Sequence, residues 1–194
     1  MKMLDTKRWL KIENFDNKWL SRSKQMLEMF ERSKQKSETP TILAEFGSGP
    51  YAPFASICSE NDSYCVKKFD LQKWDDETHV IDLNLDKFPE ERFNVCTFSG
   101  VLEYVNDVRT VLQASLSVSD FCLISYPFFP DSRILSDSDI IGVVKKRSSV
   151  NGWRNHHKLF DIISIVSEFG IIVDTEIWTD QVLIVAKSKL NAKF

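Results

Sequence analysis

Three acidic residues and a glycine-rich turn follow one another along the first half of this chain of 194 residues. An apolar segment runs into Glu45-Phe46-Gly47-Ser48-Gly49, and Asp70 and Asp82 end the next two β-rich segments. Glycines after a strand let a ligand approach the backbone closely. A carboxylate beside such a turn repels a pyrophosphate but can hold an ammonium group, and an acid at the end of the second strand can accept both hydroxyls of a ribose. These residues predict a site for a phosphate-free nucleoside ligand.

A dinucleotide site is the alternative that the glycine turn leaves open. A strand, a Gly-x-Gly turn and a downstream acid also describe nicotinamide-dependent oxidoreductases. The third glycine of that fingerprint is missing here, because Pro50, Tyr51 and Ala52 occupy its positions, and Glu45 disfavours a pyrophosphate. Pro50 and Pro53 also bracket Tyr51, so we expect the helix after the turn to begin irregularly.

Short β-rich segments that alternate with helical or loop segments must position these residues. This alternation is typical of a largely parallel sheet covered on both faces. The carboxyl ends of parallel strands meet at one edge of such a sheet, where ligands of open α/β folds bind. We expect five strands before the C-terminal region: Ile42 to Phe46, Tyr64 to Phe69, Thr78 to Asp82, Phe93 to Ser99, and Phe121 to Tyr126.

Apolar residues at helical spacing predict two helices ahead of the last of these strands. The first follows Trp9, Ile12 and Phe15, with Asp16 as its N-cap. The other begins at Asn106 or Asp107 and lies between the fourth and fifth strands. Their expected apolar faces are Trp19, Leu20, Met26, Leu27 and Phe30 in the first, and Val108, Val111, Leu112 and Leu116 in the second.

The C-terminal part is expected to contain one more helix and a hairpin. An apolar stripe from Leu159 to Phe169 predicts the helix, and we expect Gly170 to end it in a left-handed conformation. Two β segments, Ile171 to Trp178 and Gln181 to Ala186, are separated only by two residues, which predicts a tight antiparallel hairpin. Residues 127–155 have few periodic apolar positions, so we expect an irregular, substrate-facing insertion there.

Length and composition are those of one soluble α/β domain. We expect residues 1–39 to form an N-terminal helical extension and residues 40–188 a cofactor-binding core. Cys58, Cys65, Cys96 and Cys122 lack zinc-type spacing, so we expect reduced core thiols and no metal site. The net charge of −3 gives no global attraction for nucleic acid, although residues 1–38 carry a local excess of positive charge. No segment has the pattern of a signal peptide or a membrane span, and we expect a cytoplasmic protein without nucleic-acid or membrane partners.

In their order and setting, these motifs resemble those of the class I S-adenosylmethionine-dependent methyltransferases. Glu45-Phe46-Gly47-Ser48-Gly49, Asp70 and Asp82 match the cofactor motifs of that family, and the segment Ser99 to Val105 is similar to its segment after the fourth strand. The resemblance implies a three-layer Rossmann-like fold with a seven-stranded, mostly parallel sheet whose last strand is antiparallel. It also implies S-adenosylmethionine as the cofactor.

By that resemblance, each motif takes one part of the cofactor. The Gly47 to Gly49 turn, with Ser48, would line the methionine portion; Asp70 would bind the ribose; and Asp82 would hydrogen-bond the adenine amino group, with a backbone contact from Leu83. Ser99 would lie beside the same site. Tyr51 replaces the third glycine of the family's turn, which makes the loop irregular.

The acceptor side is less marked in the sequence. A general base is needed where the acceptor is a hydroxyl or an amine that loses a proton. Candidates are Glu103, Tyr104, Tyr126, His156 and His157, with Arg133, Trp153 and Arg154 as further polar or aromatic residues of the same region. The histidines could equally be ordinary polar residues at a helix start. The family pattern favours a small-molecule or carbohydrate acceptor, and a methyltransferase-like binding or regulatory module without catalysis is the alternative.

Overall fold

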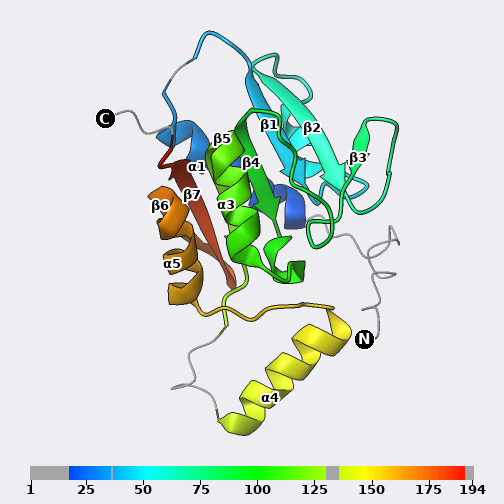
Figure 1. Cartoon of the computed structure of the whole chain (residues 1–194), viewed down its shortest axis with the longest axis vertical. Helices are drawn as coiled ribbons and strands as arrows, with labels where there is room; N and C mark the ends of the chain where they lie inside the picture. Colours follow the sequence, from blue (N-terminus) through cyan, green and yellow to red (C-terminus); the bar gives the residue numbers. More distant parts are fainter. Residues whose placement is uncertain (1–17, 36, 130–135, 191–194) are drawn as a thin grey trace.

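The computed structural model describes residues 18–35, 37–129 and 136–190 of the chain. A seven-stranded sheet in the order β3-β2-β1-β4-β5-β7-β6 crosses the molecule (Figure 1). Strands β1 to β5 pair in parallel, and β7 is antiparallel to both of its neighbours, β5 and β6. The strands are β1 (Thr41–Phe46), β2 (Tyr64–Asp70), β3 (Thr78–Val80), β4 (Phe93–Ser99), β5 (Ser119–Tyr126), β6 (Gly170–Trp178) and β7 (Gln181–Ser188). The expected sheet is confirmed, including its antiparallel last strand.

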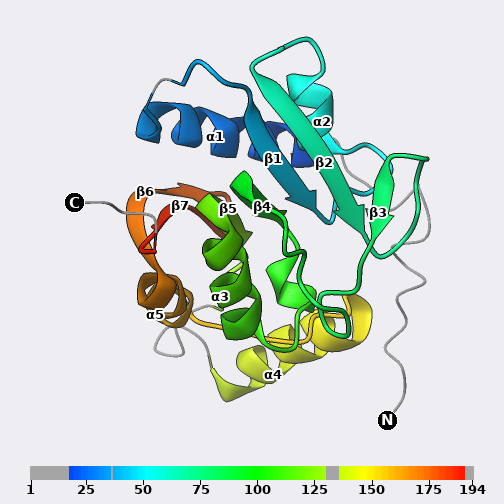
Figure 2. The ribbon, with the colours of Figure 1, turned by 45° about the horizontal axis from the view of Figure 1, so that its top comes forward.

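Helices cover both faces of the sheet, which gives three layers. Helices α1 and α2 lie on one face, and α3 and α5 lie on the other (Figure 2). The helical segments are α1 (Lys18–Ser33), α2 (Pro53–Cys58), the 3-10 turn η3 (Leu102–Tyr104), α3 (Val108–Val118), α4 (Asp137–Lys145), the π-helical turn η4 (Lys146–Val150) and α5 (Leu159–Phe169). Three-layer packing of this kind buries parallel strands on both faces.

Each face of the sheet has its own hydrophobic core. Met26, Met29 and Phe30 of α1 are buried against strand residues such as Leu43, while its neighbour Ala44 packs on the opposite side under α3 and α5. This alternation follows from the period of two along a strand. Burying each large side chain of α1 contributes about 1.5–3 kcal/mol, so α1 is an integral layer of the fold.

Several local predictions for the helices and the hairpin are confirmed. Asp107 is the N-cap of α3 and accepts a hydrogen bond from the Thr110 amide. The hairpin turns through two residues, with Thr179 at φ 54° and Trp178 paired to Gln181. Trp9, Ile12, Phe15 and Asp16 lie outside the described residues. Within α1, Leu20 points to solvent with 49% of its surface exposed, so it does not belong to the buried stripe.

Strand β3 is shorter than the sequence predicts. It ends at Val80 rather than at Asp82. The Ile81 amide still bonds to the Asp70 carbonyl, but the Asp82 carbonyl accepts from Leu85 and Asp86, so the chain has begun to turn. Asp86 also accepts a hydrogen bond from the Asp82 amide through its carboxylate. Asp82 therefore lies in a turn beyond the strand end.

Gly170 does not end α5 in a left-handed conformation; this prediction is wrong. Its φ of −128° and ψ of 163° are extended, and it is the first residue of β6. A Cβ at this position would lie 3.2 Å from side-chain atoms of Ala186 and Leu116 and from the Lys187 carbonyl oxygen. Close packing, not a turn, is thus the reason for glycine here.

The expected irregular stretch between residues 127 and 155 is partly helical. Ser136 and Asp139 form a capping box at the start of α4, and the π-helical turn η4 continues it. No residue of α4 is buried. Its apolar residues are Ile140, Ile141, Val143 and Val144, but a helix of 9 residues is too short for periodicity alone to reveal it.

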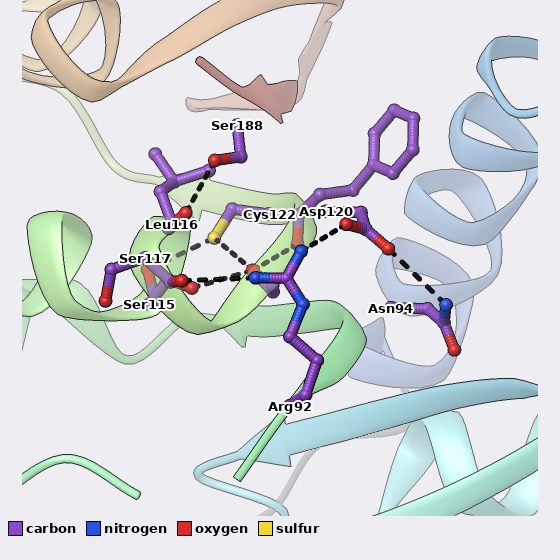
Figure 3. Close-up of polar contacts among 10 residues, drawn as sticks. Arg92, Asn94, Ser115, Leu116, Ser117, Asp120, Cys122 and Ser188 are labelled. Atoms are coloured by element: carbon purple, nitrogen blue, oxygen red, sulfur yellow. Dashed lines mark hydrogen bonds and ion pairs between the residues drawn. The ribbon is translucent and has the colours of Figure 1, made fainter. Parts of the chain in front are cut away.

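A polar network fastens the sheet at the edge away from the strand carboxyl ends (Figure 3). Arg92, just before β4, donates to the Ser117 carbonyl and pairs with Asp120 of β5. The Ser188 hydroxyl donates to the Leu116 carbonyl at the end of α3. These contacts hold the amino ends of β4 and β5 to α3, and they leave the opposite edge of these strands free for a site.

The four cysteines are free thiols, and three are buried. Cys65 is exposed, which corrects the expectation of four core thiols. It is the second residue of β2 and is exposed to solvent. In the part of the chain that the structure describes, no helix combines the length and the apolar character that crossing a membrane requires.

Candidate functional site

A cavity of about 330 Å³ lies where the carboxyl ends of β1 to β4 meet. Segments that follow each of these strands line it, together with α1 and the chain between η4 and α5. The lining includes Glu45 to Ser48, Phe69 to Leu71, Ile81 to Asn84, Ser99 to Val101, Glu103 to Val105, Asn151 to Arg154, Trp19, Arg22, Pro53 and Gln181. The structure thus brings the three predicted acids, Ser48, Leu83 and Ser99 to one cavity.

The glycine turn needs glycine at both of its positions. Gly47 has φ 70° and Gly49 has φ 59°, a region that strongly favours glycine. A Cβ on Gly47 would lie 2.4 Å from Cγ2 of Val101, so a side chain cannot fit there. Gly49 does not line the cavity itself; its amide donates to Asp70 Oδ2 at 2.8 Å. The turn therefore joins the ends of β1 and β2.

Ser48 presents a buried polar atom to this cavity. Only 2% of the residue is exposed, and its hydroxyl has no hydrogen-bond partner among the described residues. A buried hydroxyl without a partner loses free energy, about 1–3 kcal/mol. A polar ligand in the cavity would supply the missing partner.

Glu45 binds the start of α2, a structural role that its position in the sequence does not reveal. Its two carboxylate oxygens accept hydrogen bonds from the amides of Phe54 and Ala55, each at 3.0 Å. These amides are the free donors at the start of α2, whose preceding residue, Ala52, has a φ of 37° and no side-chain cap. The irregular helix start is confirmed. Burial raises the Glu45 pKa to about 7.

This role of Glu45 removes the usual pyrophosphate cradle. In dinucleotide sites the amides at the start of the helix bind the phosphates. Here a carboxylate already occupies them, so a phosphate would meet a like charge in place of free donors. This geometry therefore disfavours a dinucleotide ligand. The Glu45 residue lines the cavity, but its carboxylate binds the start of α2.

Asp70 and Asp82 are held by their own loops. Asp70 accepts from the amides of Gly49 and Gln72, and burial raises its pKa. Asp82 Oδ1 accepts from the backbone and side-chain nitrogens of Asn84. Asn84 in turn donates to the Tyr104 carbonyl, which couples the loop after β3 to the segment after β4. Asn84 was not among the predicted site residues, although an amide two residues after Asp82 is typical of such turns.

Glu103 is the buried acid of the segment after β4. Only 4% of it is exposed, and its Oε2 atom has no hydrogen-bond partner among the described residues. Burial raises its pKa to about 7, although the charges of Arg22 and Arg147 act in the opposite direction. Beside it, the Tyr104 hydroxyl accepts a hydrogen bond from the Trp153 indole nitrogen at 3.1 Å. Both predicted candidates therefore lie at the cavity.

Arg22 is a cavity residue that sequence analysis missed. It comes from α1, is only 4% exposed, and donates to the hydroxyl and carbonyl of Ser99 and to the Gln181 side chain. Ser23 also contacts the Ser99 hydroxyl. Burial lowers the Arg22 pKa. No sequence signal places it here, because its partner Ser99 lies 77 positions further along the chain.

Tyr126, His156 and His157 do not line the cavity. The Tyr126 hydroxyl, on a buried side chain, donates to Asn155 and accepts from the His157 amide. His156 contacts the Ser148 hydroxyl at 2.9 Å, and burial lowers the pKa of both histidines. These three residues hold the chain ahead of α5 in place.

A strap formed by residues 151–155 closes one side of the cavity. Its Arg154 amide donates to the Glu103 carbonyl, and the Asn155 side chain donates to the carbonyls of Leu102 and Val105, each at 2.7 Å. The Arg147 guanidinium lies 4.6 Å from the Trp153 ring centre. The end of the expected insertion therefore lines the cavity. Arg133 lies outside the described residues.

Residues 58–146 match the model of the family described as methionine biosynthesis protein MetW. This segment, less than half of the chain, includes Asp70, Asp82 and Glu103 but not the glycine turn or α1. No curated protein sequence matches the chain significantly.

Many solved structures share the fold. An O-methyltransferase family protein from Burkholderia thailandensis has a TM-score of 0.66 at 12% identity, over 97% of this chain and 64% of that protein. The N-terminal domain of EvdMO1 with SAH bound has a TM-score of 0.61 at 10% identity, covering 90% and 82%. An O-methyltransferase family 2 protein from Planctomyces limnophilus, in complex with apigenin, has a TM-score of 0.59 at 12% identity, covering 87% and 62%.

This chain spans less than two thirds of the length of several of these neighbours. At such low identity the likeness concerns the fold. Together with the sheet order and the glycine turn, it confirms the resemblance that the motifs predict: the chain has the fold of the class I S-adenosylmethionine-dependent methyltransferases.

Proposed function

We propose that this protein is an S-adenosylmethionine-dependent methyltransferase that acts on a small hydroxylated molecule such as a phenol or a sugar. The observation that carries the proposal is the cavity in which the Gly47 turn, Asp70 and Asp82 meet at consecutive strand ends. Open α/β folds bind nucleosides at this edge. The neighbours with SAH or apigenin bound have the same fold, which supports both the cofactor and the acceptor class.

The residues of the cavity fit this cofactor. Asp70 carries a carboxylate that a ribose diol can use, and the buried Ser48 hydroxyl needs a polar partner. The turn at Gly47 leaves no room for a side chain, because Val101 packs directly against it. When bound, S-adenosylmethionine supplies an electrophilic methyl group on a sulfonium. The protein has to exclude water and align the acceptor, which can supply about 7–11 kcal/mol of the barrier.

Calorimetry with S-adenosylmethionine and S-adenosylhomocysteine tests the cofactor. We expect binding to the wild-type chain, and we expect Asp70→Asn to weaken it at least about tenfold, because one charge-assisted bidentate contact contributes more than about 1.4 kcal/mol. The amide oxygen of asparagine can still accept from Gly49, so the turn keeps this anchor, while the hydrogen bond from the Gln72 amide is lost. Lys73→Gln, an exposed change a few residues away, is the control. A wild-type chain that binds neither compound would refute the proposal.

Calorimetry combined with a methyl-transfer assay separates the alternatives. Binding without methyl transfer to any phenol, sugar or amine would favour a binding or regulatory module. Tight binding of a nicotinamide cofactor would favour an oxidoreductase and would contradict the role of Glu45 at the start of α2.

A further inference from the structure

Glu103 combines three properties that a catalytic base needs. It lines the cavity, it is almost fully buried, and its Oε2 atom has no partner among the described residues. Buried carboxylate oxygens are normally hydrogen-bonded or paired, so an oxygen without a partner at a cavity points to a ligand. We propose that Glu103 is the general base that removes the proton from a neutral hydroxyl of the methyl acceptor. This inference rests on the proposed methyltransferase function.

The surroundings of Glu103 allow both of its protonation states near neutral pH. The charged groups that act on it come from three elements: Arg22 of α1, Arg147 of η4 and Asp180 of the β6–β7 turn. The two cations favour the carboxylate, whereas burial and Asp180 favour the acid, with burial the largest effect, and the pKa lies at about 7. A base with such a pKa is effective at neutral pH.

Arg22 also affects the charge that the acceptor can carry. It lines the same cavity, and its three hydrogen bonds to Ser99 and Gln181 use three of its five N–H groups. This fixed guanidinium and ionised Glu103 have opposite charges, so neither a protonated amine nor a carboxylate gains a net attraction from the pair. A neutral hydroxyl needs none. As it loses its proton, the growing negative charge on oxygen is stabilised by Arg22.

Aromatic side chains also line this cavity. Trp19 of α1, Tyr104 and Trp153 line it, and the hydrogen bond from the Trp153 indole to the Tyr104 hydroxyl fixes two of them relative to each other. Rings of this kind bind the flat faces of phenols and the apolar faces of sugars. Both acceptor types carry neutral hydroxyls.

The proton and electron balance of the step is simple. Glu103 Oε2 takes the hydroxyl proton, and the acceptor oxygen forms a bond to the methyl carbon. The electron pair of the broken carbon–sulfur bond stays on sulfur, which becomes a neutral thioether. Glu103 leaves the step protonated and returns its proton to water after the product departs.

Carbon NMR of protein labelled at the glutamate side-chain carboxyl, with S-adenosylhomocysteine bound, tests the ionisation directly. We expect one resonance, missing from Glu103→Gln, that titrates near pH 7, and a lower midpoint in Asp180→Asn because a neighbouring negative charge is removed. Asp180 is exposed, so this variant should fold normally. A Glu103 resonance that titrates like that of a free glutamate would overturn the inference.

Methyl transfer to catechol, apigenin and methyl glucoside, compared with benzylamine, tests the base itself. We expect transfer to at least one hydroxyl probe, a loss of about 10²–10⁴-fold in Glu103→Gln, and loss of the rise in rate around pH 7. The affinity for S-adenosylhomocysteine should stay unchanged in this variant. Glu60→Gln, an exposed glutamate change, should behave as wild type.

The outcomes separate the two claims. A wild-type chain that binds no S-adenosylhomocysteine refutes the proposed function itself. Cofactor binding with transfer only to benzylamine, with transfer to none of the probes, or with an undiminished rate in Glu103→Gln overturns the inference about Glu103.

Discussion

Replacing Glu103 by glutamine is expected to stabilise the protein, and to do so increasingly as pH rises. The side chain is 4% exposed, and burial raises its pKa from 4.5 to about 7. Between these two values the folded chain keeps the proton that the unfolded chain has lost. Stability therefore falls as pH rises through this range, since the folded state binds more protons. Glutamine has nearly the same shape as the protonated acid but never ionises.

The magnitude follows from the size of the shift. One pKa unit corresponds to about 1.36 kcal/mol, so ionised Glu103 costs the folded state about 3 kcal/mol at pH 8 and less than about 1 kcal/mol at pH 5. The stability difference between Glu103→Gln and wild type should widen by about 2 kcal/mol over this range. Glu45 has a similarly raised pKa, but it is present in both proteins and cancels.

Urea unfolding at pH 5, 6, 7 and 8 measures this difference. The exposed Glu60→Gln variant controls for a general loss of negative charge and should give a constant difference from wild type. A Glu103→Gln difference that stays flat with pH, or that shrinks as pH rises, would show that Glu103 ionises normally in the folded chain. It would also remove the physical basis for its role as a base near pH 7.

Three further substitutions test the packing around the cavity. Gly47→Ala should lower the free energy of unfolding by about 1–3 kcal/mol because of the positive φ alone, and it should weaken S-adenosylhomocysteine binding. Adding Val101→Ala removes only the steric clash, so calorimetry should show that it relieves only that part of the loss in binding. Gly170→Ala should cost about 1–3 kcal/mol in urea unfolding through overpacking while leaving cofactor affinity unchanged, whereas equal stability would contradict the tight contacts there. Tyr126→Phe should lower the free energy of unfolding by about 1–3 kcal/mol, and amide hydrogen exchange at Asn155 and its neighbours should become faster. Unchanged exchange would mean that the Tyr126 hydroxyl does not hold the strap in place.

The sheet and the cofactor edge could be predicted because their signals are local. Strands buried on both faces leave β-rich segments that the sequence reveals, and Asp70 is the last residue of the second of these segments. Strand ends in parallel sheets fall at one edge whatever the details of packing. Asp82, two residues beyond the end of β3, therefore still lines the cavity with Asp70. The order of elements was enough for this part of the site.

Other features depend on contacts between distant parts of the chain. Gly170 carries the same local signal as a helix-ending glycine, but the approach of Ala186 decides its role. Glu45 is adjacent to the turn in sequence, yet its oxygens bind the start of α2. The histidines seemed candidate bases by residue type, whereas Tyr126 and Ser148 hold them outside the cavity. Residue type and spacing cannot determine such side-chain directions.

The N-terminal helix belongs to the site as much as to the fold. Gly100 has φ 72°, and a Cβ there would lie 2.7 Å from one terminal nitrogen of Arg22. Position 100 therefore requires glycine for two reasons: its backbone has a positive φ, and the Arg22 guanidinium occupies the space of a side chain. Arg22 donates to Ser99, and its charge acts on Glu103, so α1 contributes to both the shape and the charge of the cavity. The segment that matches the MetW family contains Glu103 but not α1, so the residues that line this cavity extend beyond it.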